Sequence, residues 1–152
     1  MSIFPTRILL ATEGSEEAAS AARTAADLAQ KTASELHVVL VELSTAYVGM
    51  GPPEIADIPA PAQGELDEEA QSLLDTQVRQ IEADGGTVAR AHLRLGRPDV
   101  EIVALAEEIG AGLIVIGSRG LGGIRRAPMG SVSYSVLRHA HCPVLVVRRG
   151  EA

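Results

Sequence analysis

The chain has 152 residues, of which 46% are apolar; this supports one well-buried core and predicts a single domain over residues 1–152. Aromatic residues make up only 2% and tryptophan is absent, so the chain offers no stacking platform for single-stranded nucleic acid. A net charge of -7 repels nucleic acid and anionic lipid, which leaves any anion to bind at a local site.

Cysteine usage and hydropathy bear on where the protein works. Cys142 is the sole cysteine, so no internal disulfide can form, and no charged-then-apolar segment of the kind that directs secretion begins the chain. No apolar run approaches the ~20 residues that span a bilayer. We therefore expect a cytoplasmic protein with neither a membrane partner nor a nucleic-acid partner.

The first elements predict a strand, a turn and a helix. Residues 7–12 (RILLAT) form a nearly uninterrupted apolar run, and an Ala-rich stretch then extends from Ser15 to Lys31. The Ser15 side chain can cap this helix, and Glu16 and Glu17 suit its electropositive first turn. The pattern favours a helix that begins directly after Ser15.

The next segment predicts a buried strand followed by a long connection. Residues 36–43 (LHVVLVEL) are apolar on both faces, which is typical of a parallel strand covered by helices on both sides. Residues 44–64 are rich in Pro, Gly and small residues and show no sustained periodicity. We expect a flexible insert at about 44–64, either a functional lid or a disordered segment.

The second half of the chain continues the alternation of strands and helices. Residues 88–95 (VARAHLRL) alternate apolar and polar side chains, which predicts a strand with one wetter face near a sheet edge. The other predicted elements are helices at 65–83, 100–109 and 132–140 and strands at 113–116 and 143–147. Five strands and four helices predict an α/β fold with a five-stranded parallel, doubly wound sheet and helices on both faces. The ligand crevice is expected between the first and fourth strands, where strand order reverses.

A glycine-rich loop, GSRGLGGIRRAPMGS, directly follows the fourth strand. Gly117 and Gly120 permit close backbone approach, and Gly130 precedes a helix whose free N–H groups and dipole favour an anion. The loop also supplies candidate phosphate ligands, namely Arg119, Arg125, Arg126, Ser131 and Ser133. The chain contains no Gly-x-x-x-x-Gly-Lys-Ser/Thr motif, which disfavours a P-loop NTPase. No Gly-x-Gly-x-x-Gly motif follows the first strand, which disfavours a dinucleotide dehydrogenase.

The spacing Gly-x2-Gly-x9-Gly-Ser, formed by Gly117, Gly120, Gly130 and Ser131, resembles the ATP-binding branch of the universal stress protein family. The stretches RILLATEGSEEA, LIVIGSRGLGG, GSVS and HAHCPVLVVRR are similar to signatures of this family over nearly the whole chain. The resemblance implies a Rossmann-like sheet of the adenine nucleotide alpha hydrolase type and a stress-response protein that binds ATP. It also implies Mg²⁺ beside the phosphates and a homodimer formed through residues 143–148, which begin with Pro143 and end with Arg148.

The resemblance also implies a set of site residues. The nucleotide pocket would be lined by Ala11, Thr12, Glu13, Val41, Ile116, Gly117, Arg119 and Gly120. The phosphates would be held by Gly130, Ser131, Val132 and Ser133. The family usually has Asp where this chain has Glu13, and the additional methylene can shift a ribose or metal contact, so the nucleotide preference stays open.

Several alternatives remain beside this interpretation. A slow ATPase would need a group that activates water, and Glu13 could serve only if it faces the γ-phosphate. The same pocket could accept AMP or cyclic AMP, and a nucleotide-free interaction module could recruit a partner through residues 44–64. His139, His141 and Cys142 carry metal-ligating atoms, but they straddle a helix end with no fourth ligand nearby, so we expect no metal site there.

Overall fold

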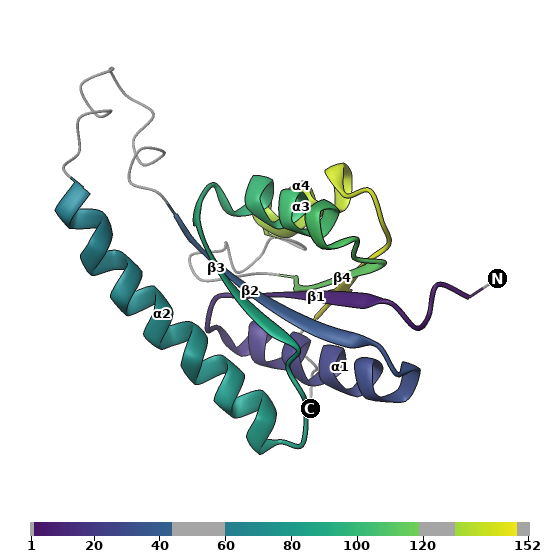
Figure 1. Cartoon of the computed structure of the whole chain (residues 1–152). Helices are drawn as coiled ribbons and strands as arrows, with labels where there is room; N and C mark the ends of the chain where they lie inside the picture. Colours follow the sequence, from purple (N-terminus) through teal and green to yellow (C-terminus); the bar gives the residue numbers. More distant parts are fainter. Residues whose placement is uncertain (1, 44–59, 119–129, 149–152) are drawn as a thin grey trace.

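The structure is a computed structural model that describes residues 2–43, 60–118 and 130–148, with side chains in the second helix from residue 68 onward. Strands and helices alternate along the chain (Figure 1). In order, the elements are β1 (Arg7–Thr12), α1 (Glu16–Thr32), β2 (Glu35–Leu43), α2 (Ala60–Ala83), β3 (Arg90–Gly96), α3 (Pro98–Ile109), β4 (Leu113–Gly117), α4 (Ser131–His139) and β5 (Val144–Val147).

All strand pairs in the sheet are parallel, and the strand order is β3-β2-β1-β4-β5. The order reverses at β1, which pairs with β2 on one side and with β4 on the other. The predicted five-stranded parallel sheet is therefore confirmed, with β1 and β4 side by side as expected. The alternating strand β3 lies at an edge, as its polar pattern predicted.

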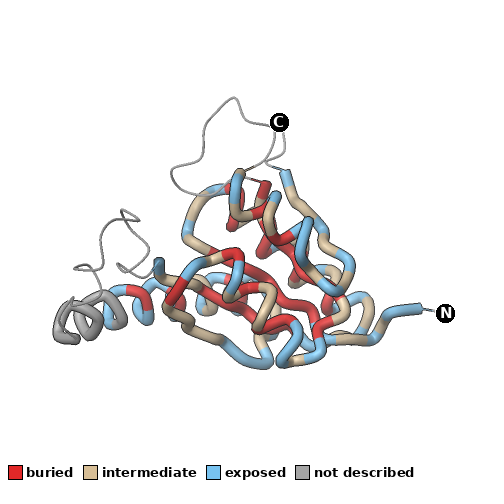
Figure 2. The backbone as a smooth tube through the Cα atoms, turned by 90° about the horizontal axis from the view of Figure 1, so that it is seen from above, coloured by how far each residue is buried: buried red, intermediate tan, exposed pale blue. Residues whose placement is uncertain are grey.

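Two apolar layers hold the helices to opposite faces of the sheet. On one face, Ile8 and Leu10 of β1 pack with α1 and α2, whereas Leu9 and Ala11 face α3 and α4. This split follows from the pleat, because successive side chains of a strand point to opposite faces. Figure 2 shows that the buried residues are concentrated along the central strands and the inner sides of the helices.

Helix α1 begins as the sequence predicts. The Ser15 side chain accepts a hydrogen bond from the Ala18 N–H (3.1 Å), and Glu16 and Glu17 occupy the first turn. The helix ends at Thr32, where Ala33 adopts a left-handed conformation with φ 55°. The face toward the sheet carries small side chains, which permit close packing on β1 and β4: Ala18, Ala21, Ala22, Ala25 and Ala29.

The start of α2 corrects the sequence prediction. The helix begins at Ala60 rather than at residue 65, so residues 60–64 belong to it and not to the predicted insert. The prolines in this stretch suggested a break, but Pro61 is the second residue of the helix, and proline is tolerated in a first turn because those N–H groups have no intrahelical acceptor. The rest of the predicted insert, residues 44–59, lies outside the described residues.

Candidate functional site

The predicted site residues on the strands gather at one edge of the sheet. Ala11 and Thr12 end β1, and Ile116 and Gly117 end β4, beside it. Val41 lies near the end of β2, one residue beyond Leu40, the register partner of Thr12. The carboxyl ends of β2, β1 and β4 thus bring these five residues together where strand order reverses. Ligands of doubly wound folds bind at this edge.

The turn between β1 and α1 is ordered by its own side chains. The Glu13 Oε1 accepts a hydrogen bond from the Ser15 N–H (3.2 Å) and another from the Ser15 hydroxyl. Gly14 has φ +93°, a conformation that L side chains rarely adopt. Leu73 of α2 lies over this turn, because a Cβ on Gly14 would be 3.3 Å from its Cδ1. The turn therefore holds the Glu13 side chain in a defined place beside the strand ends.

Helix α4 starts at the other side of the same edge. Gly130 is its N-cap residue, and the Gly130 N–H donates to the Ser118 carbonyl oxygen (2.6 Å). The next three residues, Ser131, Val132 and Ser133, form the first turn, whose N–H groups lack intrahelical acceptors. These groups and the helix dipole make the turn suitable for an anion.

The Ser133 hydroxyl forms hydrogen bonds within the protein. Ser133 is buried, and its Oγ donates to the carbonyl oxygens of Ser118 (2.8 Å) and Gly130 (3.1 Å). This hydroxyl, which the sequence suggests as a phosphate ligand, connects the start of α4 to the end of β4. The Ser131 side chain is exposed. The predicted ligands Arg119, Gly120, Arg125 and Arg126 lie outside the described residues.

The end of β4 and the start of α4 form a corner. Sequence reasoning missed two residues beside it, Glu17 and Ser118. The Ser118 hydroxyl donates to the Glu17 Oε2 (2.6 Å), and both residues are buried. A signal for Glu17 was present, because it lies four residues before Ala21 and eight before Ala25, on the face of α1 that is buried against the sheet. For Ser118 the only signal was its position directly after a fully apolar strand.

Thiol chemistry is disfavoured at the one cysteine. Burial raises the pKa of the Cys142 thiol, although a backbone hydrogen bond with Ile114 acts in the other direction. A raised pKa keeps the thiol protonated, and the protonated form is a poor nucleophile and metal ligand. Among the described residues, no group of three or more His, Cys, Asp or Glu side chains is arranged to hold a metal ion.

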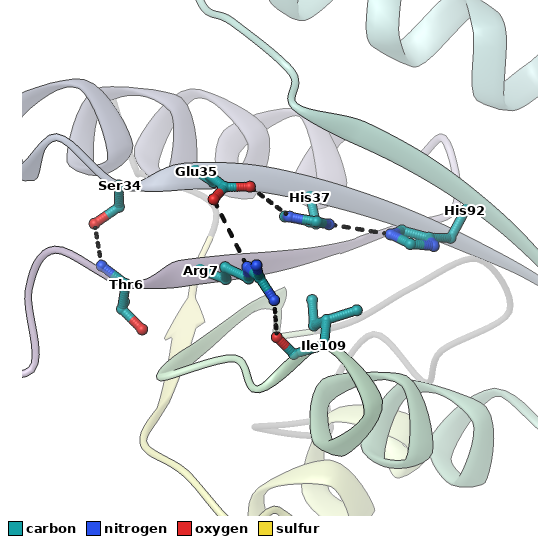
Figure 3. A network of polar contacts seen from close by, with 7 residues as sticks. All are labelled: Thr6, Arg7, Ser34, Glu35, His37, His92 and Ile109. Atoms are coloured by element: carbon teal, nitrogen blue, oxygen red, sulfur yellow. Dashed lines mark hydrogen bonds and ion pairs between the residues drawn. The ribbon is translucent and has the colours of Figure 1, made fainter.

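A network of polar contacts lies at the opposite end of the strands (Figure 3). Arg7 and Glu35, the first residues of β1 and β2, form an ion pair, and the Arg7 Nη1 donates to the Ile109 carbonyl oxygen (2.8 Å). The buried His37 ring stacks on His92 with a centroid distance of 5.4 Å, and its Nδ1 lies 3.1 Å from the His92 Nε2. This network ties β1, β2, β3 and α3 together, at a distance from the candidate site.

We expect His92 to make stability depend on pH. Burial lowers the pKa of His92, electrostatic interactions with His37, Arg90 and Arg94 lower it further, and Glu108 raises it. Because the folded pKa lies below the unfolded value of 6.5, the unfolded chain binds more protons below that pH. The contribution of His92 to the free energy of unfolding should therefore be fully present above about pH 7. It should be lost as pH drops through about 6.5 toward the folded pKa.

The measurement is the melting temperature at about pH 7.5 and about pH 5 for the wild type, His92→Gln and a control, His141→Gln, whose side chain is exposed. His92→Gln should lose less stability on acidification than the wild type, whereas His141→Gln should follow the wild type. If His92→Gln loses as much melting temperature on acidification as the wild type, His92 is not the source of the pH dependence.

One concavity formed by described residues lies elsewhere. It has a volume of about 260 Å³, lies between α1 and α2 and is lined mainly by alanine and glutamine side chains. It offers Asp27 and Asp84 but only Arg23 as a cation, which makes it a poor site for a phosphate. The strand ends of β1 and β4 remain the better candidate. Within the described part of the chain, no helix has the length and apolarity that crossing a membrane requires.

Fold and site together define a doubly wound α/β protein whose candidate ligand site lies at the switch in strand order, beside the N-terminus of a helix. The universal stress protein family matches residues 5–148. The chain belongs to the universal stress protein family.

Individual relatives agree over nearly the full length. Universal stress protein MJ0531 of Methanocaldococcus jannaschii is 33% identical over 150 residues, which cover 94% of this chain and 82% of the relative. The structure of universal stress protein UspA from Lactobacillus plantarum has a TM-score of 0.81 at 23% identity, covering 97% of this chain and 100% of that one, a likeness in fold. The universal stress protein from Archaeoglobus fulgidus in complex with dAMP has a TM-score of 0.64 at 26% identity, covering 96% and 99%.

Proposed function

We propose that this protein binds an adenine nucleotide at the carboxyl ends of β1 and β4 and acts as a nucleotide-dependent regulatory or signalling protein in the stress response. The observation that carries the proposal is the meeting of two helix N-termini at this edge: the first turn of α4 and the first turn of α1 both adjoin Ser118. The first turn of α4, which carries no acidic residue, favours an anion at the switch point. The dAMP complex of the Archaeoglobus neighbour supports an adenine nucleotide as the class of ligand.

The proposed roles follow the placement of the residues. The β2 backbone at Val41 would contact adenine, and the ends of β1 and β4 would line the rest of the pocket. The main-chain N–H groups of Gly130, Ser131, Val132 and Ser133 would lie beside the phosphates. Arg119 and Gly120 are proposed to complete the pocket from the loop that follows β4.

ATP is the proposed nucleotide, with Mg²⁺ held mainly by its phosphates. Mg²⁺ commonly takes one or two protein carboxylates together with phosphate oxygens and water, so a cluster of three protein ligands is not required. Glu13 fits this need because its carboxylate is held at the end of β1 by Ser15. When bound, the ion would neutralise phosphate charge that the nearby acidic residues Glu13 and Glu16 would otherwise oppose.

We propose binding and not catalysis. The Glu13 Oε1 already accepts hydrogen bonds from the Ser15 N–H and hydroxyl, which direct that oxygen toward its own turn. A water-activating base would need a lone pair aimed at a water molecule beside the γ-phosphate. Slow hydrolysis would be detected as ADP that accumulates with the wild type and not with Glu13→Gln.

We further propose that two copies pair through the last strand, residues 143–148, in the cytoplasm. β5 is the outermost strand of the described sheet and is bonded to β4 on one side only. A protein with Cys142 as its sole cysteine has no internal disulfide to maintain, which suits a reducing compartment.

The test of nucleotide binding is to purify the protein natively, denature it and identify the released nucleotide by mass spectrometry. We expect adenine nucleotide in near-stoichiometric amount, with ATP as the main species. AMP or cyclic AMP in its place would correct the nucleotide but keep the site. If no nucleotide is released and calorimetry detects no binding of ATP, AMP or cyclic AMP, the proposal is wrong and a protein-interaction module becomes the better reading.

A further inference from the structure

A buried hydrogen bond joins the start of α1 to the end of β4. The Ser118 hydroxyl donates to the Glu17 Oε2 at 2.6 Å, and the two residues are only 3% and 8% exposed. Glutamate is rarely buried so fully unless it is paired. A hydrogen bond to a carboxylate is about twice as strong as one between neutral groups. This contact is therefore a firm connection between the two segments.

Ser118 is also bonded through its main chain to two further segments. Its N–H donates to the Val147 carbonyl oxygen of β5 (2.9 Å). Its carbonyl oxygen accepts from the Gly130 N–H (2.6 Å) and from the Ser133 hydroxyl (2.8 Å). The position of the first turn of α4 thus depends directly on the position of Ser118, and the Ser118 side chain is fixed by Glu17.

Gly117 keeps Glu17 close to this corner. A Cβ at Gly117 would lie 3.2 Å from the Glu17 carbonyl carbon, Cβ and carbonyl oxygen, so the first turn of α1 packs directly on the backbone at the end of β4. Such contacts are tighter than nearly all real Cβ contacts. The glycine allows the approach, and the hydrogen bond to Ser118 holds it.

We propose that Glu17 is a positioning residue of the nucleotide site: through Ser118 it holds the first turn of α4 so that its main-chain N–H groups face the phosphate. This inference rests on the proposed function. Without the Glu17 carboxylate, the buried Ser118 hydroxyl loses its acceptor and the corner can relax. Preorganised N–H donors lose affinity when their supporting contacts are removed, because the ligand must then order them.

The test compares calorimetric affinities for ATP and AMP across matched variants. Glu17→Ala and Ser118→Ala should each weaken binding about 10-fold, which corresponds to the removal of one supporting contact. Glu17→Gln should stay within about 3-fold of the wild type, because its amide oxygen still accepts the Ser118 hydroxyl. The control is Ser20→Ala on the same helix, whose hydroxyl accepts a hydrogen bond from Arg23 at the surface.

Non-additivity of the binding effects shows that Glu17 and Ser118 act through the same contact. The double variant Glu17→Ala with Ser118→Ala should bind about 10-fold and not about 100-fold more weakly than the wild type, because both changes remove the same contact. Melting temperatures without nucleotide show whether each variant is folded. Should Glu17→Ala not fold, the comparison of Ser118→Ala with Glu17→Gln carries the same test.

The outcomes distinguish the inference from the function on which it rests. If the wild type binds nucleotide and Glu17→Ala binds as tightly as Ser20→Ala does, the positioning role is wrong and the proposed function stands. The same conclusion follows if the two alanine effects add fully. If the wild type binds neither ATP nor AMP, the proposed function is wrong and this inference with it.

Discussion

Gly130→Val should weaken ATP binding by at least about 100-fold and leave the unliganded fold intact. Gly130 has φ −74° and ψ 162°, an extended conformation that any residue adopts, so the backbone itself does not require glycine there. Glycine would be needed at this position because of the ligand. As the N-cap of α4, Gly130 lies where a phosphate would approach the main chain. A branched Cβ would occupy that space.

Helix capping could obscure the result, because valine is a poor N-cap and costs about 1 kcal/mol there. Gly130→Ser is the matched control, since serine is a favoured N-cap that still adds a Cβ. The serine variant should melt no lower than the wild type and yet bind ATP more weakly, with an affinity between those of the wild type and Gly130→Val. The measurement is the ATP affinity of the folded variants by calorimetry. If Gly130→Val binds ATP as tightly as the wild type, the phosphate does not bind beside Gly130.

The strands and the topology were predictable because they depend on local pattern. Two-sided apolar runs such as residues 36–43 can only be buried in a sheet with helices on both faces, and β1, β2 and β4 were identified in this way. Apolar and polar side chains alternate along β3 because one face of this edge strand is more exposed to solvent. Connections that cross over with one hand leave few ways to order such strands.

The start of α2 was less predictable. Proline and glycine between residues 60 and 65 suggest a break by their propensity, yet the helix extends through them to Ala60. Packing of an apolar face can override propensity, and Ala70, Leu74 and Ile81 of this helix are buried in the core. Boundaries that depend on tertiary contacts are not encoded in a local window of sequence.

The site divides in the same way. The meeting of Ala11, Thr12, Ile116 and Gly117 at one edge was predictable because the carboxyl ends of parallel strands lie together, and that edge follows from the topology. The partner of a hydroxyl does not follow from it. The Ser133 hydroxyl bonds to carbonyl oxygens, and Ser118 finds a carboxylate 101 residues away in the chain. Such pairings become visible only when the elements are packed together.

The free side of β5 presents main-chain groups that can pair with another strand. The carbonyl oxygens of Pro143 and Val147 accept from the N–H groups of Ile114 in β4 and Ser118 directly after it, and alternate residues of a strand bond to the same neighbour. The main-chain groups of Val144 and Val146 therefore point away from β4. Large apolar side chains remain exposed on both sides of this edge: Tyr134 (56%), Leu137 (47%) and Leu145 (36%). An open edge flanked by apolar surface favours an interface.

If two copies pair through this edge, Val146→Pro should dissociate the dimer. Proline removes the Val146 N–H, which faces the open edge, and leaves the hydrogen bonds between β5 and β4 in place. Val146→Ala is the control, because it removes a similar amount of packing and keeps the N–H. In sedimentation equilibrium we expect the wild type and Val146→Ala at twice the chain mass of 15.9 kDa, and Val146→Pro at the chain mass, with association at least about 100-fold weaker. A Val146→Pro dimer as stable as that of Val146→Ala would show that the copies do not pair through the main chain of β5, whereas a monomeric wild type would remove the homodimer from the proposed function.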